Sequence, residues 1–172
     1  EMRHVAKAEC RDAEFIRNGV AKGRIVIPKN IKHRLQNPCG IGEGLKTKIN
    51  ANIGPSRDSS NISKELTKMR ESVALGSDTI MDLSTGSRLV ETRRKILKHS
   101  KVPVGTVPIY EIVIDGLAKY GAVKDITIEE MFRVLERQAR EGVDFFTIHS
   151  GVTRHALKIL KENPRILDIV SR

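Results

Sequence analysis

The stretch Leu75-Gly-Ser-Asp78-Thr-Ile-Met-Asp82-Leu-Ser-Thr-Gly86 contains the pattern that decides the fold. Its central residues, Asp78 to Asp82, are typical of a short buried strand bounded by turn-forming residues. The Gly-Ser-Asp before the strand is a natural connection from a helix, because glycine tolerates the left-handed conformation that ends many helices. A segment with helical spacing follows the Ser-Thr-Gly turn. The stretch therefore indicates one βα unit.

Three further segments have the same character, and a helix-like segment follows each of them. They are Lys48-Ile-Asn-Ala-Asn52, Val102-Pro-Val-Gly-Thr-Val-Pro-Ile-Tyr110 and Val143-Asp-Phe-Phe-Thr-Ile-His149. Glu141-Gly-Val-Asp144 also repeats the pattern Leu75-Gly-Ser-Asp78. Repeated βα units with right-handed crossovers predict an α/β fold, either a barrel or a doubly wound sheet.

The length of the chain corresponds to part of a barrel. A complete (β/α)8 barrel needs about 250 residues. We predict that residues 46–172 form roughly its first half, with four βα units and the start of a fifth strand at Ile166-Leu-Asp-Ile-Val170. Such a half-barrel leaves strand edges unpaired, so we expect further residues or a second copy to complete it.

Residues 1–45 have a different pattern and are predicted to form a small N-terminal helix, strand and loop segment. Asp12 can cap a short helix that ends at Gly23, and Arg24-Ile-Val-Ile27 is typical of a strand. The later Gly40-Ile-Gly42-Glu-Gly44 lacks the spacing of a phosphate-binding loop. A plain turn is therefore the favoured interpretation.

Helical periodicity is clearest in two segments between the first and fourth predicted strands. Ile62, Leu66, Met69 and Val73 have the spacing of an amphipathic helix. Thr127 and Glu130 have capping-box spacing and open a helix that runs to Arg140. Other helices are expected at residues 87–99, 111–120 and 154–162.

Composition excludes several classes of protein. The net charge is +10, but the basic residues are dispersed and no aromatic platform accompanies them, so we expect no nucleic-acid partner. No apolar run approaches a membrane span, and we expect no membrane association. Cys10 and Cys39 form no CxxC motif, which argues against a disulfide framework or structural zinc site and favours the cytoplasm.

Side chains that can contact a ligand lie at the ends of the four predicted strands. They are Asn52, Met81, Tyr110 and His149, separated by 29, 29 and 39 positions. Ligands bind at the carboxyl ends of strands in α/β proteins. The spacing therefore predicts a binding site at one rim of the sheet.

The residue types leave several roles open. His149 suits a general acid or base, a ligand contact or a metal ligand, or is a hydrogen-bonded histidine at a strand tip. Asp82 can bind ribose hydroxyls or cap the next loop, and the structural role is favoured. Met81 is more typical of a core, and Tyr110 suits ligand contact and packing equally. Asn50 and Asn52 share one strand face, which favours a polar ligand or network.

Four ordered motifs closely resemble the phosphomethylpyrimidine synthase family. They are Lys48-Ile-Asn-Ala-Asn-Ile-Gly54, Met81-Asp-Leu-Ser-Thr-Gly86, Pro103-Val-Gly-Thr-Val-Pro-Ile-Tyr110 and Gly142-Val-Asp-Phe-Phe-Thr-Ile-His149. The resemblance implies a (β/α)8 barrel and radical S-adenosylmethionine chemistry on 5-aminoimidazole ribonucleotide in thiamine biosynthesis. It also implies a 4Fe-4S cluster, S-adenosylmethionine, zinc as a further metal, and a homodimer.

The resemblance assigns substrate binding to Asn52, Met81, Tyr110 and His149, which favours a site role for Met81. It further assigns a phosphate contact to Ser171, because Ile169-Val-Ser-Arg172 resembles the start of the family's Ser-Arg-Gly-Gly loop.

The chain also departs from the family. The CxxCxxxxC cluster motif and the later metal-binding histidines have no counterpart, and Ser87-Arg88 replaces the usual Gly-Asp. We therefore expect no metal site in these residues and no turnover by this chain alone. The alternatives are a non-catalytic half-barrel that binds a nucleotide or phosphate ester, and a basic nucleic-acid-binding protein.

Overall fold

The computed structural model describes residues 1–56 and 61–167. Its centre is a parallel sheet in the order β3 (Asn50–Ile53), β4 (Thr79–Asp82), β5 (Val104–Thr106) and β6 (Phe145–Phe146). The helices that alternate with these strands are α3 (Ile62–Ala74), α4 (Leu89–His99), α5 (Pro108–Tyr120), α6 (Ile128–Glu141) and α7 (Arg154–Glu162), with a short 3-10 helix η1 (Val123–Asp125) before α6. This sequential parallel order confirms the predicted α/β fold of partial (β/α) barrel type.

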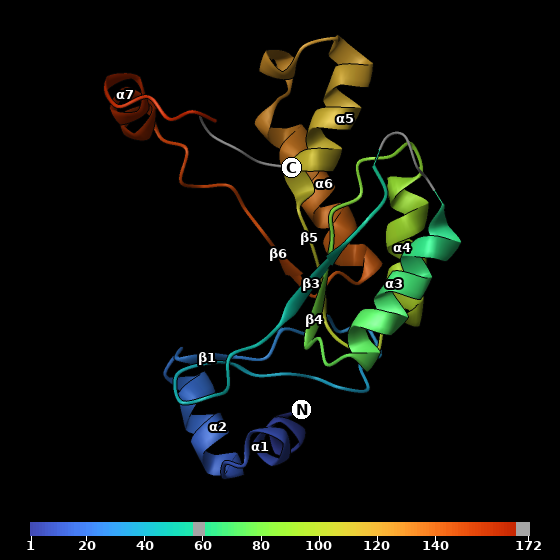
Figure 1. The fold of residues 1–172 in the computed structure, drawn as a ribbon, viewed down its shortest axis with the longest axis vertical. Helices are drawn as coiled ribbons and strands as arrows, with labels where there is room; N and C mark the ends of the chain where they lie inside the picture. Colours follow the sequence, from blue (N-terminus) through green and yellow to red (C-terminus); the bar gives the residue numbers. More distant parts are fainter. Residues whose placement is uncertain (57–60, 168–172) are drawn as a thin grey trace.

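One face of the sheet is covered by helices α3 and α4 (Figure 1). Ile80 of β4 and Val104 of β5 are completely buried there, in one apolar cluster with Met69 of α3 and Ile96 of α4. Side chains alternate between the two faces along a strand. Met81 and its neighbours at the same level therefore point to the opposite face.

Local signals place the start of α6 and the ends of α3 and α6 where the sequence predicts them. The Thr127 hydroxyl accepts a hydrogen bond from the backbone N–H of Glu130, whose carboxylate accepts one from the Thr127 N–H. Gly76 after α3 and Gly142 after α6 have φ angles of 102° and 108°. Such angles favour glycine and allow the chain to turn back into the next strand.

The repeated Gly-x-Asp pattern has a common structural role. Asp78 accepts a hydrogen bond from the backbone N–H of Ile49, at the start of the neighbouring strand β3. Asp144 does the same for Val104 of β5 and also contacts His33 Nδ1 at 2.6 Å. Each aspartate thus joins the beginnings of two adjacent strands.

The N-terminal residues pack around a separate small core. Helices α1 (Met2–Glu9) and α2 (Ala13–Ala21) accompany β1 (Ile25–Val26), which pairs antiparallel with β2 (Ile41–Gly42). The predicted helix after Asp12 and the predicted strand are confirmed, whereas α1 was not anticipated. The plain turn predicted over Gly40 to Gly44 is only partly right, because Ile41–Gly42 form β2 and the turn begins at residue 43. The domain boundary at residue 45 stays a prediction.

The predicted third and fourth strands are too long. β5 ends at Thr106, and Tyr110 lies in the first turn of α5, whose first residue is Pro108. The proline ring favours this helix start, because its fixed φ and missing N–H suit the first helical position. β6 contains only Phe145 and Phe146, so His149 lies in the following loop.

The chain leaves the sheet after β6. Residues 147–153 lead to α7, which has no buried residue and lies apart from the other helices (Figure 1). In the predicted strand at 166–170, Ile166 and Leu167 lie in a turn, and the other residues are outside the described ranges. Ser171 is outside them as well.

Within residues 1–56 and 61–167, no helix is long and apolar enough to cross a membrane.

Candidate functional site

Asn52 and Met81 lie side by side on the sheet face that points away from α3 and α4. They are register partners in β3 and β4, and Gly105 and Phe145 continue the same level through β5 and β6. Met81 is buried, whereas Asn52 is exposed. This row of register partners across the four strands therefore combines an amide with an apolar surface.

Gly105 gives this level its shape. A Cβ atom at Gly105 would lie 2.3 Å from Cε2 of Phe145, so any side chain there would displace the ring. The glycine thus leaves room for the Phe145 ring against β5, and Gly105 separates Phe145 from Met81 in the register. Met81 and Phe145 therefore form an apolar surface beside the Asn52 amide.

A polar chain connects β4 with β3 on the same face. The buried Thr79 hydroxyl donates to Asn50 Oδ1 at 2.7 Å, and Asn50 Nδ2 donates to Asn52 Oδ1 at 3.4 Å. The sequence anticipated that the two amides share a face and favoured a polar ligand or network there. It gave no sign of Thr79, which lies 29 positions further along the chain.

Thr147 is a second residue that the sequence did not single out. Its hydroxyl donates to the Met81 thioether sulfur at 3.9 Å, and its backbone N–H donates to the Thr106 carbonyl at 2.9 Å. The spacing of Phe145, Thr147 and His149 at every second position could have indicated that Thr147 shares a face with the other two residues. Thr147 connects the loop that carries His149 to the Met81 side of the site.

Tyr110 and His149 come together from different elements. The ring centroids are 6.3 Å apart with an interplanar angle of 42°. Tyr110 is half-buried at the start of α5, and His149 is exposed in the loop after β6. The structure thus brings the four described candidate residues into two pairs, Asn52 with Met81 and Tyr110 with His149.

Asp82 takes no part in this face. It is buried on the helix side of β4, where its carboxylate accepts hydrogen bonds from the backbone N–H and the hydroxyl of Ser84. Burial raises the pKa of Asp82 to about 6, although the Ser84 hydrogen bonds lower it. Asp82 therefore caps the turn after β4, the structural role that the sequence favoured.

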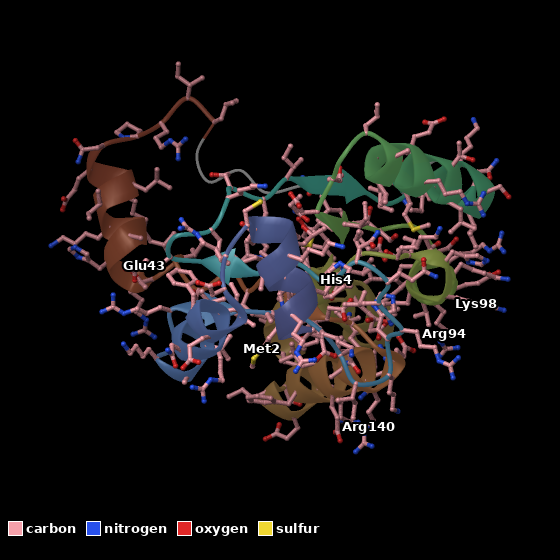
Figure 2. The ribbon with its side chains drawn as sticks, turned by 90° about the horizontal axis from the view of Figure 1, so that it is seen from below. Met2, His4, Glu43, Arg94, Lys98 and Arg140 are labelled. Carbon is pink, nitrogen blue, oxygen red and sulfur yellow. The ribbon has the colours of Figure 1, made fainter. Side chains whose placement is uncertain are left out.

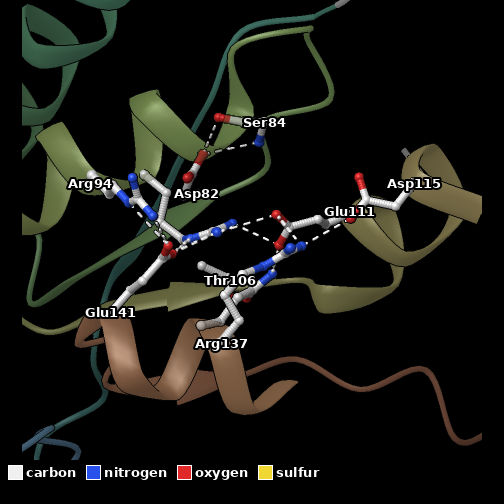
Figure 3. Close-up of polar contacts among 10 residues, drawn as sticks. Asp82, Ser84, Arg94, Thr106, Glu111, Asp115, Arg137 and Glu141 are labelled. Carbon is white, nitrogen blue, oxygen red and sulfur yellow. Dashed lines mark hydrogen bonds and ion pairs between the residues drawn. The ribbon is translucent and has the colours of Figure 1, made fainter. Parts of the chain in front are cut away.

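A buried polar network fixes the start of α5 and thus Tyr110 (Figure 3). Glu111 accepts from Arg93 of α4 at 2.9 Å and from Gln138 of α6 at 2.5 Å. Gln138 in turn accepts from the Thr106 hydroxyl of β5 at 2.6 Å. Since these residues join four elements, the network holds the Tyr110 backbone relative to the sheet.

Four basic side chains surround a hollow outside the candidate site. The hollow has a volume of about 450 Å³ and lies at the end of the sheet where β5 and β6 begin. Its lining includes the basic residues Lys32, Arg34, Arg94 and Lys98 and the acidic Glu141. Figure 2 shows Arg94, Lys98 and Arg140 pointing outward from α4 and α6. These basic residues therefore lie at the opposite end of the sheet from the strand termini that carry the candidate site.

The cysteines do not fit an iron–sulfur cluster. Cys10 is exposed at the end of α1, whereas Cys39 is buried, and its burial raises the pKa of the thiol to about 11. Clusters are held by several thiolates. Among the described residues, no three His, Cys, Asp or Glu side chains are grouped so that they can hold a metal ion.

Comparison with known proteins finds relatives along the whole chain. Residues 1–172 match the sequence model of the radical SAM ThiC family. The chain is 52% identical over all 172 residues to the phosphomethylpyrimidine synthase of Thermoanaerobacter sp. (strain X514). It is 49% and 52% identical to the phosphomethylpyrimidine synthases of Thermodesulfovibrio yellowstonii and Methanococcus aeolicus, again over its full length. The chain spans 40% of the length of each of these curated relatives.

Proposed function

Because the chain belongs to the radical SAM ThiC family, we propose that the complete protein is a phosphomethylpyrimidine synthase of thiamine biosynthesis. It would convert 5-aminoimidazole ribonucleotide into 4-amino-5-hydroxymethyl-2-methylpyrimidine phosphate, and it would act as a carbon–carbon lyase. The proposal is supported by the identity of 52% to a relative with this name.

The radical chemistry would depend on a 4Fe-4S cluster and S-adenosylmethionine, which the family implies. When bound, the cluster would supply one electron to S-adenosylmethionine, whose sulfonium C–S bond would break to give methionine and the 5′-deoxyadenosyl radical. Cys10 and Cys39 do not fit as its ligands, so we assign the cluster ligands, and a zinc site, to other parts of the complete protein. The described residues would then contribute substrate binding.

The observation that carries this role is the arrangement of the two residue pairs. Asn52 and Met81 are register partners, and Tyr110 and His149 face each other at 6.3 Å. The Asn52 amide would hydrogen-bond the ribonucleotide, and Met81 would contact its apolar surface. Tyr110 would add a polar contact from the first turn of α5, and His149 would add one from the loop after β6. Ser171 is proposed to contact the phosphate.

The partner is the small-molecule substrate rather than nucleic acid or a membrane. The protein would act in the cytoplasm as a homodimer.

The test uses the complete protein, purified anaerobically with its cluster reduced. Incubation with 5-aminoimidazole ribonucleotide and S-adenosylmethionine should yield the pyrimidine phosphate and 5′-deoxyadenosine, measured by mass spectrometry. Asn52→Ala should lose most of this activity. Lys158→Ala, on the exposed surface of α7, should keep it. A cluster-loaded protein that cleaves S-adenosylmethionine but leaves the ribonucleotide unchanged would contradict the proposal.

A further inference from the structure

Asn52 is the last member of a directed hydrogen-bond chain. Thr79 and Asn50 are register partners in β4 and β3, and the Thr79 hydroxyl donates to Asn50 Oδ1 at 2.7 Å. Asn50 Nδ2 then donates to Asn52 Oδ1 at 3.4 Å. Thr79 is only 3% exposed, so its hydroxyl is held by the surrounding sheet.

The hydrogen bonds from Thr79 to Asn50 and from Asn50 to Asn52 fix the orientation of both side-chain amides. A hydroxyl has one hydrogen to donate, and an asparagine amide has a distinct accepting oxygen and donating nitrogen. Because Thr79 donates to the Asn50 oxygen, the Asn50 nitrogen is turned along the strand towards Asn52. One lone pair of the Asn52 oxygen then accepts from Asn50, which fixes the orientation of the amide and leaves the Asn52 nitrogen, with its two N–H groups, to donate to a ligand.

We propose that Thr79 and Asn50 are positioning residues that make Asn52 a hydrogen-bond donor to the substrate. The ligand atom opposite Asn52 is therefore an acceptor, as on a phosphate, a ribose oxygen or an unprotonated ring nitrogen. This inference rests on the proposed function, which makes Asn52 a substrate contact. It adds two residues that act only through Asn52.

A double-mutant cycle on the complete protein tests the proposal. The measurement is the dissociation constant for 5-aminoimidazole ribonucleotide, obtained by calorimetry. Asn50→Ala and Thr79→Val should each raise it about five-fold, the effect of one hydrogen bond. If Asn50 acts only through Asn52, then Asn50→Ala should change the constant less than about two-fold in an Asn52→Ala background.

Two further variants separate orientation from general stability. In Asn50→Asp the carboxylate only accepts, so Asn52 turns its nitrogen inward and shows its oxygen to the ligand. This variant should bind more weakly than Asn50→Ala. Thr79→Ser keeps the hydroxyl and should restore binding to within about two-fold of the parent protein. Thr92→Val removes another buried threonine hydroxyl, on α4, and should leave the dissociation constant unchanged.

The outcomes are distinct. Loss of affinity on Asn50→Ala that is equal in both backgrounds would mean that Asn50 contacts the ligand by itself, and would overturn the positioning role. Unchanged binding by Thr79→Val would also overturn it. Failure of the parent protein to bind the ribonucleotide would instead refute the proposed function, and the positioning role with it.

Discussion

Arg93 of α4 and Glu111 of α5 form a two-pronged ion pair inside the protein, with N–O distances of 2.9 and 3.3 Å. Their side chains are 2% and 1% exposed, and Glu141 of α6 contacts the same guanidinium at 2.7 Å. Glu111 directly follows the candidate site residue Tyr110. The pair therefore connects the packing of three helices with the position of the site.

Glu111→Ala should destabilise the protein by about 3 kcal/mol, because it leaves part of the Arg93 charge buried and unpaired. Chemical denaturation measures the change. Glu136→Ala on the exposed side of α6 removes only the surface pair with Arg140 and should cost less than about 1 kcal/mol. Equal effects of the two substitutions would contradict the structural role of the buried pair.

Asp144→Ala should also cost about 3 kcal/mol, because three groups lose their acceptor at once. These groups are the backbone N–H of Asn30, the backbone N–H of Val104 and the His33 ring. The loop at residues 30–37 should become sensitive to limited proteolysis. Asp115→Ala, which removes an exposed partner of Arg137, is the matched control and should leave the loop protected.

Asp82 should make stability depend on pH. Burial raises its pKa to about 6, whereas an unfolded aspartate titrates near about 3.9. The folded state thus holds the proton more tightly, and this contribution to stability is complete below about pH 4 and is lost as pH rises through about 6. In Asp82→Asn the free energy of unfolding should no longer fall as pH rises through this range. The parent protein should lose at most about 3 kcal/mol of this free energy between acidic and neutral pH.

Denaturation curves between about pH 4 and pH 8 measure the difference between the parent protein and Asp82→Asn. Asp125→Asn, an exposed position in η1, controls for the change of charge. A parent protein and an Asp82→Asn variant with parallel pH profiles would show that Asp82 does not titrate in this range.

Tyr110 and His149 should act as a coupled pair in substrate binding, because their rings lie 6.3 Å apart. Aromatic pairs contribute about 0.5–1.5 kcal/mol beyond their burial. Tyr110→Ala and His149→Ala should each raise the dissociation constant for 5-aminoimidazole ribonucleotide about ten-fold. The double variant should raise it by less than the product of the two single fold-changes. Calorimetry gives the three constants.

His155→Ala, on the exposed surface of α7, is the matched control for the histidine and should bind like the parent protein. Strictly multiplicative effects of Tyr110→Ala and His149→Ala would indicate that the two rings act independently.

The sequence predicted the βα units well because each one depends on short-range patterns. Apolar strands, the Thr127–Glu130 capping box and the glycines before Asp78 and Asp144 are all local signals, and the structure contains each of them. The strand ends were less predictable. Apolar residues continue from Val102 to Ile109, and the periodicity does not reveal that Pro108 already begins a helix.

The candidate site was predicted only in part. Asn52, Met81, Tyr110 and His149 were chosen as strand-end groups, and two of them turned out to lie beyond their strands. Thr79 and Thr147 were missed, because their hydroxyls gain a role only through contacts with residues 29 and 66 positions away.

The sequence by itself determined the family, the alternation of strands and helices, and most helix ends, since these depend on motifs and neighbouring residues. Only the tertiary structure decided which charges are buried. Arg93 and Glu111 lie on helices where charged residues normally face water, and nothing local distinguishes them from Arg94 or Glu136. The packing of α4, α5 and α6 against β5 removes them from solvent, and a buried charge then requires a partner.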